Sequence, residues 1–491
     1  MLVQTCSGLV QGIALDGAYV FRGIPYAAPP IGSQRFKAPM PVSAWRGIRT
    51  CDRFGPIAPQ KNVPNGFMPE LAQSEDCLNL NVWTSGTSAA LKPVMVYIHG
   101  GGFVSGKGAE CDGLRYAVED GFVFVSINYR LGTLGFLYLG ELLGEEYGTS
   151  GNNGMLDIVA ALQWVQRNIA AFGGDPSQVT VIGNSAGAKC AATLYAMDAA
   201  RGLFRGVIAQ SGATQSIRDR HTANTTTMRL LDELGITRSQ AHRLLELPAE
   251  RLIEAQSAIG FDTSRSLHMF GPVADGSVIP TEPLGSLGTR SHLPPLLIGT
   301  NEDEAASFIQ GDPLLWPPSL EIAGRLFGTS APIVWESFVQ YNDILPSAQA
   351  WSRTLSEHLY TIGAMQLAAA AADAGASVWM YRLQCGGPLG AIHGYEGSLI
   401  NGPQNADSAI NPDDPHRVDP EDYPLARGMR AAWVAFAKTG NPNVTLLPAW
   451  PVYDSERSTM VFNRVSRVRT DLPEPAGAGV PHQVWRVRSC S

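Results

Sequence analysis

The sequence predicts an α/β fold in which helices cover both faces of a mainly parallel central sheet. Short, nearly continuous apolar runs, such as residues 93–99 and 122–129, are typical of strands that are buried on both faces. Between such runs, residues 155–169 carry apolar side chains at helical spacing. Strands that alternate with helices in this way indicate a parallel sheet covered on both sides.

In the first part of the chain, residues 8–24 predict short strands around turns. Residues 25–75 are rich in proline and glycine and favour loops. Buried strands are then expected at residues 79–83, 93–99 and 122–129. The helix at residues 155–169 follows them, with Asn152 or Asn153 as its cap.

In the second part, residues 178–182 form a β-branched run after a Gly-Gly-Asp-Pro turn, and residues 185–196 favour a helix. Further short strands are expected at residues 206–210, 295–299 and 378–383. Residues 220–290 and 312–375 predict helical insertions, and a late helix ends near Gly440. Because no linker, repeat or low-complexity tract is seen, residues 1–491 are expected to form a single domain.

Composition and charge exclude several classes of function. The chain has 491 residues, a formal net charge of −8 and no basic cluster, which argues against nucleic acid or an anionic membrane as partner. No apolar run reaches transmembrane length, and the first residues lack the pattern of a signal peptide. The seven cysteines are too scattered for a disulfide framework and contain no C-x-x-C pair. We therefore expect a cytoplasmic protein without a metal site.

The segment Gly183-Asn184-Ser185-Ala186-Gly187 has the pattern G-x-S-x-G and lies between a predicted strand and a predicted helix. A strand that turns directly into a helix forces its middle residue into strained backbone angles, and side chains two positions away would collide with neighbouring backbone. The serine hydroxyl is then exposed above a helix N-terminus, which favours a developing oxyanion. A plain Gly-Ser-Gly turn is the alternative, and the flanking strand and helix favour the nucleophile.

A nucleophilic serine needs a base, and a third group that orients the base. Four histidines follow the serine and a candidate acid: His358, His393, His416 and His482. His393 is the most favourable of them, because it follows the predicted strand 378–383 after a glycine-rich loop. For the acid, Glu302, Asp303 and Glu304 all follow the predicted strand 295–299, and the residues alone do not choose among them.

The segment His99-Gly100-Gly101-Gly102-Phe103 also follows a predicted strand. Three consecutive glycines let backbone N–H groups approach a substrate oxygen closely, as an oxyanion hole requires. A phosphate-binding loop of the P-loop type is excluded, because no Lys-Ser or Lys-Thr pair follows.

These motifs resemble the type-B carboxylesterase/lipase family of the α/β-hydrolase fold, in particular its bacterial p-nitrobenzyl-esterase-like members. The resemblance covers about residues 3–465. It is carried by the motifs FRGIPYAAPP (21–30), SEDCLNLNVW (74–83), HGGGF (99–103), NYRLGTLGF (128–136), FGGDPSQVTVIGNSAGA (172–188), QSG (210–212), GTNEDE (299–304) and HGYE (393–396).

The resemblance implies roles for individual residues. Ser185 matches the nucleophile, His393 the general base and Glu304 the acid of the triad. The oxyanion donors match Gly101, Gly102 and Ala186. Supporting roles next to the triad fall to Asn184 and Ser211, and positions that line the substrate pocket fall to Phe103, Phe270 and Phe308.

Three departures from the family pattern are informative. Asn184 stands where the family usually has glutamate, which removes a negative charge near the histidine and predicts altered pH dependence or substrate choice. Secreted members of the family join the position of Cys77 by a disulfide to a cysteine at the position of residues 58–60. This chain has Ala58-Pro59-Gln60 there, in agreement with a cytoplasmic enzyme. The loop at 58–77 lacks the tryptophan that binds cations in cholinesterases, so recognition of choline is not expected.

The resemblance implies a serine esterase, without a cofactor, that acts on small to medium uncharged esters as a monomer or homodimer. The helical insertions would then cover the active site. An acyltransferase or a lactone-forming biosynthetic enzyme of the same fold is the main alternative, and Asn184 is the feature that suggests it. A non-catalytic binding protein is a remote alternative, because it predicts a broken triad.

Overall fold

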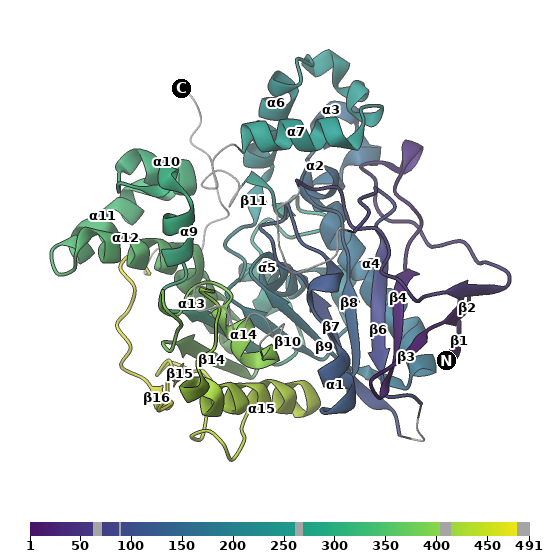
Figure 1. Cartoon of the computed structure of the whole chain (residues 1–491). Helices are drawn as coiled ribbons and strands as arrows, with labels where there is room; N and C mark the ends of the chain where they lie inside the picture. The colour runs from purple at the N-terminus through teal and green to yellow at the C-terminus, as the bar shows by residue number, and fades with distance from the viewer. Residues whose placement is uncertain (62–70, 88–89, 261–268, 403–413, 479–491) are drawn as a thin grey trace.

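The computed structural model describes residues 1–61, 71–87, 90–260, 269–402 and 414–478. Its centre is an eleven-stranded sheet with the order β16-β15-β14-β13-β10-β9-β7-β8-β6-β4-β3. The strands from β8 to β15 pair in parallel, and antiparallel pairs add the two edges. The prediction of a mainly parallel sheet is therefore confirmed (Figure 1).

The strands of this sheet are β3 (Ile13–Leu15), β4 (Ala18–Pro25), β6 (Asn79–Thr84), β7 (Lys92–Ile98), β8 (Val123–Ile127), β9 (Gly174–Asn184), β10 (Gly206–Gln210), β13 (Leu296–Asn301), β14 (Val378–Leu383), β15 (Thr459–Phe462) and β16 (Arg467–Arg469). Two small sheets stand beside it, made of β1 (Leu2–Thr5), β2 (Gly8–Gln11) and β5 (Ile48–Thr50), and of β11 (Arg218–Asp219) and β12 (Val273–Ala274).

The helices are α1 (Leu114–Val118), α2 (Gly132–Phe136), α3 (Gly140–Leu143), α4 (Asn153–Asn168), α5 (Ala186–Leu194), α6 (Arg220–Glu233), α7 (Ala249–Ile259), α9 (Ala306–Gly311), α10 (Leu320–Phe327), α11 (Ala331–Asn342), α12 (Ser347–Ser356), α13 (Ile362–Asp373), α14 (Tyr395–Asn401) and α15 (Tyr423–Thr439). A five-residue π-helix, η11 (Glu357–Thr361), joins α12 to α13.

Alternation along the strands divides the core between the two faces of the sheet. In β7, Val94, Val96 and Ile98 point into a cluster that includes residues of α4, α5 and α13. Met95, between them, points into a second cluster that includes residues of α1, α14 and α15. Because both faces are covered, the central strands contain apolar residues at nearly every position, which explains their continuous apolar runs.

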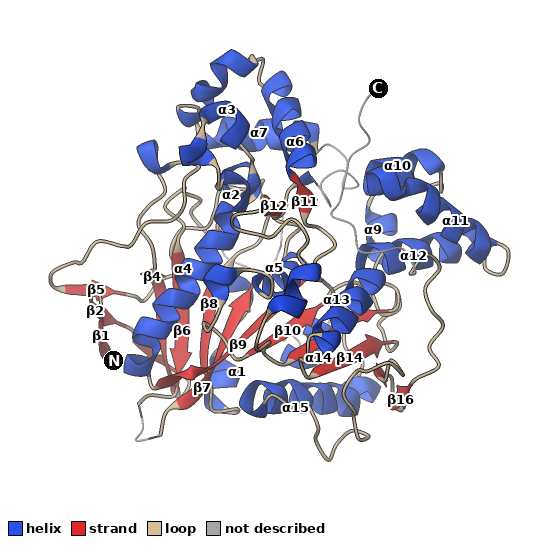
Figure 2. Ribbon diagram, turned by 180° about the vertical axis from the view of Figure 1, so that it is seen from behind, coloured by secondary structure: helices blue, strands red, loops and turns tan. Residues whose placement is uncertain are grey.

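The two predicted insertions form separate groups outside the sheet (Figure 2). Helices α6 and α7 lie next to α2 and α3, whereas α10, α11 and α12 lie together at another part of the molecule (Figure 1). The second group has a hydrophobic cluster of its own around the buried Trp351. The prediction of a largely helical 220–290 segment holds only as far as α7, because residues 271–295 consist mainly of loops and short turns.

Candidate active site

Ser185 lies at the junction of β9 and α5, where the predicted strand turns directly into the predicted helix. Its backbone is in a strained region, with φ of 57° and ψ of −123°. The backbone N–H of Ser185 donates to the carbonyl of Gln210 at 2.9 Å, which fixes the turn against the end of β10. The serine therefore stands at the carboxyl edge of the parallel sheet, above the first turn of α5.

The two glycines of the pentapeptide are required by close backbone contacts. A Cβ atom on Gly183 would lie 2.3 Å from the carbonyl carbon of Gly187, and one on Gly187 would lie 2.0 Å from the carbonyl oxygen of Ile98. Both distances are far below van der Waals contact, so no side chain fits at either position. This agrees with the steric argument made from the sequence.

Replacement of Gly187 by alanine is expected to lower the free energy of unfolding by about 3 kcal/mol or more, because backbone rather than a flexible side chain has to move. Gly324→Ala is a matched control, because it adds the same methyl group in helix α10 with no atom within 4 Å. That change should raise stability by about 0.5–1 kcal/mol. Urea denaturation of both variants measures the difference, and equal stabilities would contradict the steric argument.

His393 and Glu304 meet although 89 residues separate them. The Nδ1–H of His393 donates to Oε2 of Glu304 at 2.6 Å. Glu304 is fully buried, and its Oε1 accepts the backbone N–H of Asn301 at 2.8 Å. Nε2 of His393 is buried and has no hydrogen-bond partner among the described residues. An imidazole held in this way presents an unprotonated nitrogen that can accept a proton.

The other candidates from the sequence lie in different surroundings. The carboxylate of Glu302 accepts the Gln384 amide at 3.2 Å, and that of Asp303 accepts the backbone N–H of Ala391 at 3.1 Å. His358 contacts Ser337 Oγ at 2.9 Å in the helical group, where burial lowers the pKa of His358 to about 4. Burial also lowers the pKa of His416, which lies in a loop, and His482 lies outside the described residues.

The glycine-rich loop after β7 lies against the serine. A Cβ atom built on Gly100 would stand 3.2 Å from Cβ of Ser185. The next two residues are Gly101 and Gly102, and Ala186 is the first residue of α5. The loop therefore reaches Ser185 at Gly100, and Ala186 follows the serine directly at the N-terminus of α5.

A second buried carboxylate, Glu396, lies beside the His393–Glu304 pair and was not assigned a role from the sequence. Its Oε1 accepts Ser211 Oγ at 2.8 Å and Nδ2 of Asn184 at 3.1 Å. Its Oε2 accepts Nδ2 of Asn301. Both supporting residues inferred from the resemblance, Asn184 and Ser211, therefore contact Glu396. The signal in the sequence was a carboxylate three positions after the favoured histidine, in the motif HGYE.

Burial and the nearby charge of Glu304 raise the pKa of Glu396 to about 7. Because the unfolded chain releases this proton near pH 4.3, the folded protein alone holds it between about pH 4.3 and pH 7. Stability should therefore fall by roughly 4 kcal/mol as the pH rises through this window, and the contribution is constant above it. Glu396→Gln should remove this slope when unfolding is measured by urea denaturation from pH 4.5 to 8. An unchanged slope in the variant would assign it to another group.

The three expected pocket residues differ in position. Phe103 and Phe270 belong to the hydrophobic core and expose 0% and 1% of their surface. Phe308, in α9, is half-buried, and its ring centroid lies 5.1 Å from that of His393. Tyr360, in η11, approaches the same imidazole at 4.7 Å. Phe308 and Tyr360 therefore form an aromatic wall around the histidine, and the sequence predicted only the first of them.

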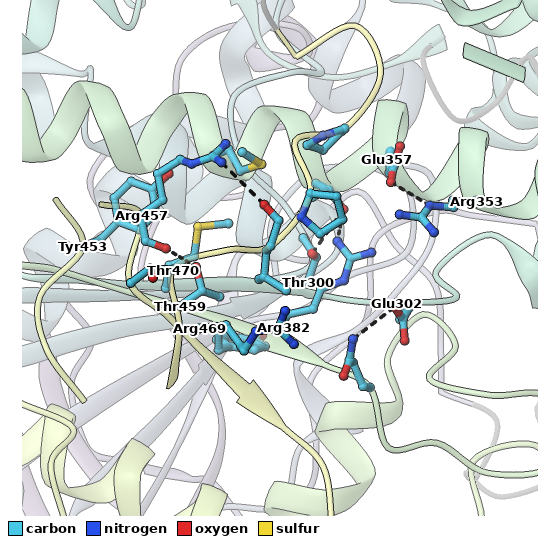
Figure 3. A pocket seen from close by; sticks show the side chains of 18 residues that line it. Thr300, Glu302, Arg353, Glu357, Arg382, Tyr453, Arg457, Thr459, Arg469 and Thr470 are labelled. Carbon is cyan, nitrogen blue, oxygen red and sulfur yellow. Dashed lines mark hydrogen bonds and ion pairs between the residues drawn. The ribbon is translucent and has the colours of Figure 1, made fainter. Parts of the chain in front are cut away.

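A cavity of about 220 Å³ opens elsewhere, between β14, β15, α13 and residues 470–475 (Figure 3). Its lining includes four arginines, Arg353, Arg382, Arg457 and Arg469. Arg353 forms an ion pair with Glu357, Arg457 with Glu474, and Arg469 with Asp471. Ser185 and the other residues expected to bind substrate do not line this cavity. It is therefore separate from the candidate active site.

A mainly parallel sheet of this order, with a serine on the strand-to-helix turn of a central strand, defines an α/β-hydrolase. A model of the carboxylesterase family matches residues 1–314 and 334–473. The chain therefore belongs to the carboxylesterase family and is a carboxylesterase, so the resemblance seen in the sequence is confirmed.

Individual relatives cover nearly the whole chain. The para-nitrobenzyl esterase of Bacillus subtilis is 35% identical over 96% of both chains. The fumonisin B1 esterase of Sphingopyxis macrogoltabida is 33% identical over 94% of this chain and 86% of its own. The crystal structure of the carboxylesterase EST55 from Geobacillus stearothermophilus superposes with a TM-score of 0.85 at 37% identity, covering 96% of this chain and 98% of its own. Within the described part of this chain, every helix is too short or too polar to span a lipid bilayer.

Proposed function

We propose that this carboxylesterase hydrolyses esters through an acyl-enzyme formed on Ser185, with His393 as general base and Glu304 as the residue that orients it. The observation that carries the proposal is the buried His393–Glu304 pair, with its 2.6 Å contact and its unpartnered Nε2. This geometry is the one in which a neutral imidazole accepts the proton of an attacking hydroxyl.

In the first half of the reaction, Ser185 Oγ attacks the ester carbonyl while its proton moves to Nε2 of His393. The negative charge on the carbonyl oxygen rests on the N–H groups of Gly101, Gly102 and Ala186. When the tetrahedral intermediate collapses, the bond to the alcohol oxygen breaks and His393 donates the proton to that oxygen. The alcohol leaves, and the acyl group stays on Ser185.

In the second half, water attacks the acyl carbon and gives one proton to His393. The new intermediate collapses with cleavage of the bond to Ser185 Oγ, which takes the proton back. The carboxylic acid is released and the enzyme is restored. All proton transfers run through one imidazole, so no cofactor is required for this sequence.

Small to medium uncharged esters are the substrates that the surroundings of His393 favour. The aromatic rings of Phe308 and Tyr360 flank the imidazole, and an aromatic wall binds apolar acyl or alcohol groups. Hydrolysis of p-nitrophenyl esters from acetate to long-chain acids tests the proposal, and the best chain length measures the acyl pocket. Failure to hydrolyse any member of the series would contradict a general esterase.

Acyl transfer to an alcohol is the second candidate function, because Asn184 brings a neutral amide where the family usually carries a carboxylate. The amide is used in a hydrogen bond to Glu396 at 3.1 Å. Adding a primary alcohol to the p-nitrophenyl ester assay separates the two functions. Ester product that exceeds free acid at low alcohol concentration would favour the transferase, whereas free acid in excess supports the hydrolase.

A further inference from the structure

Lys189 is a buried lysine one helical turn after Ser185. Its backbone N–H donates to the carbonyl of Ser185 at 2.9 Å, and only 5% of the residue is exposed. It is the one charged residue of helix α5, whose sequence AGAKCAATL is otherwise apolar or neutral. The side chain therefore buries an ammonium group, on the helix that begins directly after the candidate nucleophile.

The ammonium of Lys189 lies beside the residues that surround His393. Nζ stands 5.2 Å from the centroid of the Tyr360 ring, and that ring stands 4.7 Å from the ring of His393. Among the described residues, no carboxylate lies within ion-pair distance of this Nζ. Tyr360 belongs to the π-helix η11, a local irregularity of a type that is frequent at functional sites.

The charge on Lys189 is stabilised by two interactions with this site. Burial lowers the pKa of Lys189 to about 8, and attraction to Glu304 opposes part of that shift. The face of the Tyr360 ring adds a cation–π contact. The ammonium therefore stays protonated at neutral pH and loses its charge as the pH rises above about 8.

Such a group is costly in a core. An unpaired buried cation destabilises the folded state, and an apolar side chain of similar length would fill the same space at lower cost. Packing alone therefore gives no reason for a lysine at this position. An electrostatic effect of its charge on the neighbouring His393–Glu304 pair would give such a reason.

We propose that Lys189 is a positioning residue whose positive charge keeps His393 neutral, and so able to accept a proton, at lower pH than the rest of the site would allow. The proposal rests on the proposed esterase function. A nearby cation disfavours the imidazolium and favours the carboxylate of Glu304. Asn184 has an effect of the same sign, because it places a neutral amide where the family usually has a carboxylate that would stabilise the imidazolium.

Other titratable groups also face this cluster, and all of them are present in both wild type and variant. They are Glu304 after β13, Tyr381 in β14, Glu396 in α14, His416 in its loop, Tyr360 in η11 and Cys190 in α5. The difference between two pH profiles therefore reports the total effect of removing the Lys189 charge, including any part that acts through Glu304 and Glu396.

The experiment compares kcat/KM between pH 4.5 and 9 for wild type and Lys189→Met. Nζ of Lys189 lies 5.2 Å from the Tyr360 ring, which lies 4.7 Å from that of His393, so the charge is at most about 10 Å from the imidazole. At an effective dielectric constant of about 20, loss of a unit charge at this distance should move the acid limb upward by about one pH unit. The plateau should change little, because the reacting groups are intact. Lys189→Arg keeps the charge and should keep the limb near its wild-type position.

Lys438→Met is the matched control. Lys438 also lies over an aromatic ring, with Nζ 5.5 Å from the centroid of Phe122, but it is exposed on α15. Its removal deletes the same charge and the same kind of contact away from the triad, so the acid limb should stay in place. If Lys189→Met does not fold, Lys189→Gln removes the charge with a polar side chain and serves the same comparison.

An acid limb that is unmoved in a folded, uncharged Lys189 variant would overturn the proposal, as would an equal shift in Lys438→Met. Ser185→Ala separates this failure from failure of the proposed function. If that variant loses turnover while the Lys189 variants leave the limb unmoved, the esterase mechanism stands and only the role of Lys189 is wrong. If Ser185→Ala retains turnover, the proposed function is wrong, whatever Lys189 does.

Discussion

Replacement of Ser185 by alanine is expected to lower kcat for p-nitrophenyl esters by about 10⁶-fold, since the acyl-enzyme can no longer form. The loss should be in kcat rather than in KM, because the oxyanion donors and the pocket are unchanged. The methyl side chain of alanine occupies less space than the serine it replaces, and the strained backbone is held by the contact of its N–H with Gln210. The variant should therefore keep the thermal stability of the wild type.

Ser211→Ala is the matched control for Ser185→Ala. Ser211 is another buried serine with a positive φ, of 56°, but its hydroxyl donates to Glu396 rather than to a substrate. This control should retain clear turnover. A phosphonylating reagent of the kind used for serine hydrolases should also label the wild type once, on Ser185, and leave Ser185→Ala unlabelled. Similar activity in the two serine variants, or labelling elsewhere, would refute the assignment of the nucleophile.

Glu304→Gln is expected to lower kcat by about 10⁴-fold without unfolding the protein. The glutamine oxygen can still accept the backbone N–H of Asn301, which Glu304 Oε1 accepts at 2.8 Å. Its amide NH₂ then faces Nδ1 of His393 and donates to it. The imidazole proton is thereby forced onto Nε2, so the nitrogen that faces the substrate can no longer take the proton of Ser185.

Glu302→Gln tests whether the effect is specific. It makes the same chemical change two residues earlier in the same loop, where the carboxylate contacts the Gln384 amide. Steady-state kinetics of both variants should show near wild-type kcat for Glu302→Gln and the large loss for Glu304→Gln. Equal losses would mean that the loop as a whole, rather than the contact with Nδ1, supports activity.

The strands of the central sheet were predictable because burial on both faces leaves a strong local signal. The runs at 206–210 and 378–383 coincide with β10 and β14, and the late helix ends at Thr439, with Gly440 as its cap, close to the expected position. Two strands at one side of the sheet were not predicted. β15 is buried but only four residues long, and β16, whose residues Arg467–Arg469 are exposed or half-buried, has no apolar pattern.

The sequence by itself determined the elbow at Ser185. The features that mark it are nearly consecutive: a strand, two glycines around the serine, and a helix. The contacts that leave no room for a Cβ atom on Gly187 come from Ile98, in the neighbouring strand β7. The glycine-rich loop after β7 was determined in the same way. Such features can be recognised in the sequence because the residues that mark them follow one another in the chain.

Only the tertiary structure decided which polar groups meet. Among Glu302, Asp303 and Glu304 the residues alone left the choice open, and the family resemblance rather than any local pattern pointed to Glu304. The direction of each side chain depends on the path of the loop after β13. That path is set by contacts with distant parts of the chain, since the neighbouring strand β14 begins 77 residues after β13 ends. The contacts of Glu396 with Asn184, and of Lys189 with Tyr360, likewise join residues that are far apart in the chain. Their electrostatic effect depends on burial and distance, which no residue type or spacing encodes.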